Sequence, residues 1–156
     1  MNGKPHKKAY KSPDITVTFE ARRCLHAAEC VNGLPSVFDT TVRPWIRPDG
    51  APADQVAEVV RRCPSGALHY ELADAEAETP DRPTRITRTP AGQLYVRGDL
   101  LLAPTTATAP ETETETDAET ETDAEVGPRR ETRVVLCGCG DSGLQPYCDH
   151  SGPCGR

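Results

Sequence analysis

Apolar and polar residues alternate near the start of the chain. Ile15, Val17 and Phe19 are separated by threonines, and this period of two predicts a β-strand with one buried face. Residues 67–72 (ALHYEL) have a similar character and predict a second strand, which could pair with the first. The first part of the chain is therefore expected to contain a small sheet.

A helix is predicted between these two strands, over residues 52–62. Val56, Val59 and Val60 recur at helical spacing and therefore share one face. The proline that opens this segment suits a first helical turn, and Pro64 prevents the helix from continuing. The sheet and the helix together predict a small α+β unit.

The second part of the chain has mainly β character. Residues 93–103 (QLYVRGDLLLA) predict a β-hairpin that turns at Gly98 and Asp99. Residues 131–136 (ETRVVL) predict a further strand, which delivers the chain to Cys137.

Charge is distributed unevenly along the chain. Eight acids and no base lie between Glu111 and Glu125, and removing their eight negative charges from the formal net charge of −6 leaves +2. This tract has no apolar periodicity and repels itself, which predicts a disordered acidic insertion over residues 104–129. Residues 1–13 are expected to be a disordered basic tail, and residues 74–84 an acidic linker. No basic patch indicates a nucleic-acid partner.

The composition leaves little material for a large apolar core. Only 4% of the residues are aromatic, whereas seven are cysteines, which could stabilise small domains through a metal. The chain shows no secretory signal and no apolar segment long enough to cross a bilayer, so a cytoplasmic protein without a membrane partner is expected. In that compartment clustered thiols favour metal binding over disulfides. No enzyme motif is visible, so catalysis is not expected.

Four metal-ligand side chains lie within residues 137–150, CGCGDSGLQPYCDH. Cys137 and Cys139 form a C-x-C pair, and Cys148 and His150 follow after a loop rich in turn-forming residues. Three soft sulfur ligands and one nitrogen ligand suit either an iron–sulfur cluster or a zinc ion.

This motif resembles that of the CDGSH iron–sulfur family, the mitoNEET family. Its pattern, C-x-C-x2-[ST]-x3-P-x-C-D-x2-H, is matched at Cys137, Cys139, Ser142, Pro146, Cys148 and Asp149. The resemblance implies a mainly β domain that binds a 2Fe–2S cluster through three cysteines and one histidine. It also allows a homodimer.

The fourth ligand of this site departs from the family pattern. The family histidine would fall at Gly152, and His150 lies two residues earlier. His150 is the first choice for the fourth ligand and Cys154 is the alternative, while water or no ligand is the third option. The same donor set could instead form a structural zinc site.

A second and looser set of cysteines lies in the first half. Cys24 and Cys30 form a C-x5-C pair, and Cys63 stands before Pro64. Taken singly, each could be an ordinary buried thiol. Residues 15–72, however, resemble the divergent single-cluster 4Fe–4S ferredoxin domain through the phrases CLHAAEC, LPSVFD, RPWI and CPSGALHY. The resemblance implies that the three cysteines bind cluster iron.

One ligand of this expected cluster has no counterpart among the thiols. The middle cysteine of the usual ferredoxin run would fall at Ala27, which has no donor atom. Either a 3Fe–4S cluster is held by three thiolates, or His26 completes a 4Fe–4S site. Both alternatives stay open at the level of sequence.

These observations predict an α+β protein with two small domains. A ferredoxin-like unit over residues 14–73 is followed by a CDGSH-like, mainly β unit over residues 85–156. Electron transfer to or from a redox partner protein is the leading role. Cluster transfer to an apo-acceptor protein, or redox and iron sensing, is the alternative. A zinc-stabilised interaction module is the third.

Overall fold

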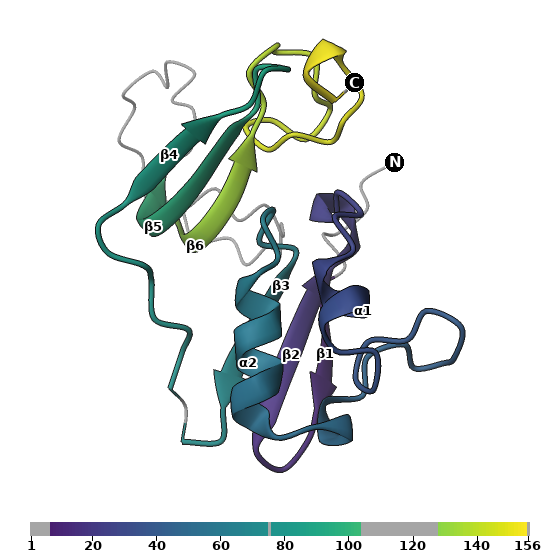
Figure 1. Ribbon diagram of the computed structural model, residues 1–156. Coiled ribbons are helices and arrows are strands. Elements are labelled where there is room, and N and C mark those ends of the chain that lie inside the picture. Colours follow the sequence, from purple (N-terminus) through teal and green to yellow (C-terminus); the bar gives the residue numbers. More distant parts are fainter. Residues whose placement is uncertain (1–6, 75, 104–127, 156) are drawn as a thin grey trace, which may run out of the picture.

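Two small antiparallel sheets organise the computed structural model, which describes residues 7–74, 76–103 and 128–155 (Figure 1). Each sheet has three strands, in the orders β1-β2-β3 and β4-β5-β6. The first sheet consists of β1 (Lys7–Lys11), β2 (Ile15–Glu20) and β3 (Leu68–Leu72). The second consists of β4 (Arg85–Arg88), β5 (Leu94–Leu102) and β6 (Arg129–Leu136).

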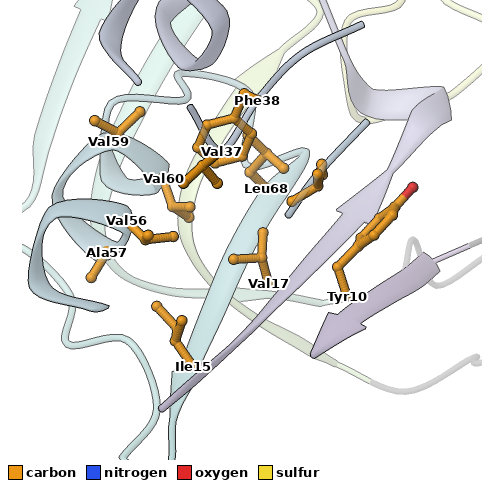
Figure 2. Close-up of a cluster of buried hydrophobic side chains, with 11 residues drawn as sticks. Tyr10, Ile15, Val17, Val37, Phe38, Val56, Ala57, Val59, Val60 and Leu68 are labelled. Carbon is orange, nitrogen blue, oxygen red and sulfur yellow. The ribbon is translucent and has the colours of Figure 1, made fainter. Parts of the chain in front are cut away.

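Helix α2 (Ala53–Arg61) packs on the first sheet and closes its core (Figure 2). Its three predicted core valines are buried, and Val17 of β2 and Leu68 of β3 meet them from the sheet. Each such side chain contributes roughly 1.5–3 kcal/mol when it is fully buried. The short α1 (Glu29–Gly33) and the 3₁₀ turns η1 (Ala21–Arg23) and η2 (Pro48–Gly50) complete this unit.

The second unit has a thin core on each face of β6. Consecutive strand residues point to opposite faces, so Val134 packs with Val96 and Tyr147, whereas Val135 packs with Cys148 and Cys154. A further 3₁₀ turn, η3 (Pro153–Gly155), carries Cys154 to this second cluster. The thiols therefore form part of the core.

Most of the predicted elements are confirmed. The strands expected at residues 15–19, 67–72 and 131–136 are β2, β3 and β6, and β3 pairs with β2 as foreseen. The helix expected over residues 52–62 is α2. The α+β character holds in the form of two small sheets and few helices.

The hairpin predicted at Gly98 and Asp99 is wrong. Residues 94–102 form one continuous strand, and its register against β6 shifts between Arg97 and Leu100. Gly98 has a φ of 152°, and a Cβ there would lie 2.3 Å from Thr84 Oγ1. The glycine therefore marks a bulge with close backbone approach, and not a turn.

The tail predicted over residues 1–13 is also wrong where the structure describes it. Residues 7–11 form β1 and pair with β2, because the buried Tyr10 ring joins the core of the first unit. Residues 1–6 lie outside the described part of the chain.

The structure tests the predicted linker over residues 74–84 but only the ends of the predicted insertion over residues 104–129. Residues 104–127 of the insertion lie outside the described part of the chain, and Arg129 already belongs to β6. The predicted linker over residues 74–84 makes buried contacts, since the Glu78 side chain pairs with Arg133 and is 5% exposed. Among the described helices, none is both long and apolar enough to cross a membrane.

A buried ionic network joins the two units. Arg23, which ends η1, donates to Glu131 Oε1 of β6 over 2.8 Å and is only 2% exposed. The same guanidinium donates to the carbonyl oxygens of Ser65 and Arg133, and it stacks 4.4 Å from the Tyr147 ring centroid. Because buried charges are costly without partners, these contacts fix how the units meet.

A second buried arginine reaches in the opposite direction. Arg133 of β6 donates to the carbonyl oxygens of Cys63 over 2.9 Å and Leu68 over 2.6 Å, both in the first unit. It also forms an ion pair with Glu78. Each unit thus contributes one buried arginine whose guanidinium donates hydrogen bonds to the other unit.

Replacing Glu131 by Gln tests this network. Breaking a buried ion pair costs about 3–5 kcal/mol, and we expect about 3 kcal/mol here because Glu20 lies 3.7 Å from Arg23. Urea unfolding followed by circular dichroism measures the loss. Glu58→Gln is the control, since its pair with Arg62 is exposed and its loss should cost less than about 0.5 kcal/mol. Equal effects of the two variants would contradict a structural role for the network.

Candidate metal centres

The three cysteines of the first unit surround one pocket. Cys24 follows η1, Cys30 lies in α1, and Cys63 follows α2, so three separate elements deliver the three thiols. All three line one pocket with a cavity volume of about 30 Å³, together with His26 and Ala27. The structure thus brings together every residue that the sequence predicts for this site.

The loop between Cys24 and Cys30 has an unusual backbone. His26 and Ala28 adopt left-handed conformations, with φ of 55° and 61°. Non-glycine residues in this region carry strain of roughly 1–3 kcal/mol, which is typically found where a loop must present its backbone to a ligand. His26 and Ala27 are exposed, so the loop covers the thiols without burying itself.

Backbone donors point at the sulfur atoms of this site. Burial raises the pKa of the Cys24 thiol, and the backbone N–H of His26 partly offsets that rise. Burial likewise raises the pKa of Cys30, the N–H of Val31 opposes it, and the nearby Cys63 and Cys24 raise it further. N–H groups directed at cysteine sulfur are how proteins tune iron–sulfur centres.

The spacing of these thiols differs from that of the second unit. Among the described residues, the set whose ligand atoms all lie within 4.8 Å of one another consists of Cys137, Cys139 and Cys154. The sulfurs of Cys24, Cys30 and Cys63 do not meet this limit, so the first site is more widely spaced. Since metal–sulfur bonds of about 2.3 Å place the sulfurs of one tetrahedral ion about 3.8 Å apart, the open spacing suits a cluster better than a single ion.

The segment that carries Cys63 is positioned by the second unit. The carbonyl oxygen of Cys63 accepts from Arg133 of the second unit, while the Ser65 carbonyl accepts from Arg23 of the first unit. Gly66 has a φ of 68°, and a Cβ there would lie 2.3 Å from the carbonyl oxygen of Arg133. Only glycine allows the two backbones to approach this closely.

The C-terminal cysteines form a compact thiol knot, made of Cys137, Cys139, Cys148 and Cys154. Cys154 Sγ lies 3.2 Å from Cys139 Sγ, 3.6 Å from Cys148 Sγ and 3.9 Å from Cys137 Sγ. The first two cysteines of the motif are 3.6 Å apart. Cys154 is the member that contacts all the others.

Hydrogen-bond donors surround the thiol knot. Burial raises the pKa of Cys137, but backbone N–H groups of Ser142, Cys139 and Gly140 outweigh it and bring the pKa to about 6. The Gln93 side-chain amide donates to Cys148 Sγ over 3.3 Å. The backbone donors favour the thiolate of Cys137, the form in which sulfur binds metals. The N–H groups of Asp141 and Cys154 lower the pKa of Cys139, but its side-chain contacts with Cys154 and Cys137 leave that pKa raised.

Two polar residues of the motif order its loop. Ser142 donates to the Tyr147 carbonyl over 2.6 Å and accepts from the N–H of Leu144. The Asp149 carboxylate accepts from the N–H groups of Gly143 and Ser151, each over 2.9 Å. Hydrogen bonds from Ser151 lower the pKa of Asp149 to about 2, so the carboxylate stays charged.

His150 lies outside the thiol knot. It is exposed and has a φ of 62°, whereas Cys154 is buried at the centre of the knot.

The sequence analysis did not predict the buried ionic residues Arg23, Glu131 and Arg133. Isolated charged residues in and beside strands look solvent-facing, and no local pattern marks them as buried.

Gly152 provides a test of the knot. A Cβ at this position would lie 2.6 Å from Cys139 Sγ and 2.7 Å from Asp141 Cβ, so Gly152→Ala must displace the thiol. We expect at least a roughly tenfold loss of metal retention against a chelator, the scale typical of a disturbed metal shell. Gly143→Ala is the control, because its Cβ would only touch Asp149 Oδ2 at 3.4 Å. Equal retention in both variants would contradict this geometry.

Comparisons with known proteins concern the first unit. Residues 10–73 match the family model described as a divergent 4Fe-4S mono-cluster. The uncharacterized protein YjdI of Escherichia coli (strain K12) is 38% identical over 63 residues, which are 40% of this chain and 83% of that protein. YjdI of Escherichia coli O157:H7 gives the same values. No solved structure matches.

The matched residues end before the second unit begins, so the CDGSH resemblance of the second unit stays a prediction. The match does cover all three cysteines that line the open pocket, together with β2, α2 and β3. Through residues 10–73, the chain belongs to the divergent 4Fe–4S mono-cluster family.

Proposed function

We propose that this protein is an electron carrier with an iron–sulfur cluster in its first unit. The observation that carries the proposal is the convergence of Cys24, Cys30 and Cys63 on one pocket within a 4Fe–4S family domain. The donor set fits the group, because thiolates are the usual ligands of such clusters. When bound, the cluster supplies one-electron redox chemistry.

The residues of this pocket have two different roles in holding a cluster. The three thiolates hold iron, and the N–H groups of His26 and Val31 stabilise the negative charge on sulfur. Ala27 offers no donor, so His26, which lines the same pocket, is the candidate for the fourth ligand of a 4Fe–4S cluster. Without it, three thiolates would hold a 3Fe–4S cluster.

The C-terminal thiols are proposed to hold a second centre. The CDGSH resemblance implies a 2Fe–2S cluster on Cys137, Cys139 and Cys148 with one further ligand, and the donors around the thiol knot support a metal there. Leu25, the neighbour of Cys24, packs against the core cluster that contains Cys148. This contact favours exchange of electrons between the two centres before a partner protein is reached.

A second function is favoured by the exposed loop at His26 and Ala27. Exposure of a cluster-bearing loop suits transfer of the cluster to an apo-acceptor protein, or sensing of iron or oxidants. The short sulfur–sulfur distances of the thiol knot favour a third role, a zinc-stabilised module. Neither alternative requires catalysis by this chain.

Anaerobic purification of the full chain separates these functions. Wild type, Cys63→Ala and Cys148→Ala are compared by iron and sulfide assays and by EPR. Wild type is expected to show two EPR signals. Each substitution should remove a different signal, because the two thiols lie in different sites. A normally folded wild type that contains neither iron nor sulfide would reject the electron-carrier proposal, and zinc in its place would establish the third role.

His26→Ala tests the fourth ligand of the first centre. We expect the EPR signature to change from that of a 4Fe–4S cluster to that of a 3Fe–4S cluster, because one iron loses its protein ligand. His26→Cys is the matched control and should preserve the 4Fe–4S form. An unchanged spectrum in His26→Ala would show that histidine is not a ligand.

A further inference from the structure

The position that carries the histidine in the CDGSH pattern cannot supply a ligand in this chain. Gly152 is buried, and its Cα is so close to the knot that a Cβ would lie 2.6 Å from Cys139 Sγ. No donor-bearing side chain fits between this backbone and the thiols. The chain instead continues for two residues into η3, the turn that holds Cys154.

Cys154 occupies the place that a fourth ligand would take. Its sulfur lies within 3.2–3.9 Å of each of the other three sulfurs of the thiol knot, and its side chain is 1% exposed. These distances bracket the separation of about 3.8 Å expected between sulfurs that share one tetrahedral ion.

The backbone of His150 is held by contacts that leave its imidazole outside the thiol knot. Its backbone adopts a left-handed conformation in the turn that Asp149 orders through Ser151. A Cβ on Gly155 would lie 2.4 Å from the Cα of His150, so η3 packs directly against this backbone. The imidazole is exposed, whereas Cys154 is buried and belongs to the close ligand set of the described residues. Cys148 lies outside that set as well, but it is buried and its sulfur lies 3.6 Å from that of Cys154.

We propose that Cys154, and not His150, is the fourth protein ligand, so that four thiolates hold the C-terminal metal centre. The proposal rests on the proposed function only in that these thiols bind metal at all. The chemistry shared by the groups that fit is affinity for soft sulfur: a 2Fe–2S cluster or a single zinc or iron ion. All four ligands are supplied by one chain.

The surroundings suit an all-thiolate centre. Four thiolates bring more negative charge than three thiolates and a neutral imidazole, and the site offers donors to balance it. These are the Gln93 amide at Cys148 and the backbone N–H groups directed at Cys137 and Cys139. Relative to a site with imidazole ligation, the extra charge lowers the reduction potential of any redox-active group held there.

Two single substitutions decide between the candidate ligands. The full-length chain is purified anaerobically as wild type, Cys154→Ser, His150→Ala and Cys139→Ser, and metal and sulfide contents, visible spectra and EPR are compared. We expect His150→Ala to match wild type. Cys154→Ser should lose the C-terminal signal to the same extent as Cys139→Ser, at least about tenfold in metal retention. The signal of the first unit serves as the internal measure of folding.

Measurements on wild type keep the test decisive if Cys154→Ser does not fold. Chelator-treated wild type is titrated with Co²⁺, and the sulfur-to-cobalt absorbance and the X-ray absorption of cobalt report how many thiolates bind. Four sulfur neighbours are expected. Three sulfurs and one nitrogen, with the nitrogen lost in His150→Ala, would overturn the assignment. Iron with sulfide identifies a 2Fe–2S cluster, whereas zinc or iron without sulfide identifies a single ion.

The failure of this inference differs from the failure of the proposed function. If Cys139→Ser loses metal and Cys154→Ser keeps it, the C-terminal centre exists but its fourth ligand is not Cys154. If none of the C-terminal substitutions changes the metal content while Cys63→Ala does, the second centre itself is absent, and both the centre and its ligand set are rejected.

Discussion

Two buried guanidinium groups impose the constraint on which the described structure depends. Arg23 and Arg133 are each about 2% exposed, and a charge so far from water must find acceptors within the protein. Arg23 finds the Glu131 carboxylate and the Arg133 carbonyl in the second unit, and Arg133 finds the carbonyls of Cys63 and Leu68 in the first. The Ser65 carbonyl of the first unit and the Glu78 carboxylate of the connecting segment complete the two sets of partners. Neither apolar core is large, so this exchange of charged partners is what joins the two sheets.

The same constraint places the candidate metal ligands. Arg23, Cys24 and Leu25 are consecutive, and each makes a different contact: the first with the buried network, the second with the open pocket, and the third with the core beside the thiol knot. On the other side, Arg133 holds the carbonyl of Cys63, and the strand it belongs to runs on to Cys137. The two candidate centres therefore share their scaffold.

Sequence patterns predict the parts of this structure that local physics decides. Alternation at Ile15, Val17 and Phe19, and helical spacing of the valines in α2, are sufficient to locate those elements. The C-terminal cysteine set could also be recognised, because its spacing is a local property, whereas the first set was recognised through a family resemblance of residues 15–72. Gly98 was misread because a bulge and a turn use the same residue, and the neighbouring strand that decides between them is distant in sequence.

The remaining features depend on contacts that no local window contains. The arginine at position 23 and its carboxylate partner are separated by 108 positions, so neither could be recognised as buried. The centrality of Cys154 arises only when η3 folds back onto the motif. Tyr10 was assigned to a tail because its neighbours are lysines, although one aromatic ring is enough to dock the strand.

The approach of β6 to Gly66 has a consequence for the medium around the first centre. The carbonyl of Cys63 faces the guanidinium of Arg133, where an isolated first unit would offer it water. Solvent access and local dielectric around a buried metal group influence its redox potential. The second unit thus shields the backbone at Cys63 from outside the pocket, whose lining residues all belong to the first unit. The same sequence, standing alone, would leave the backbone at Cys63 in a wetter and more polarisable environment.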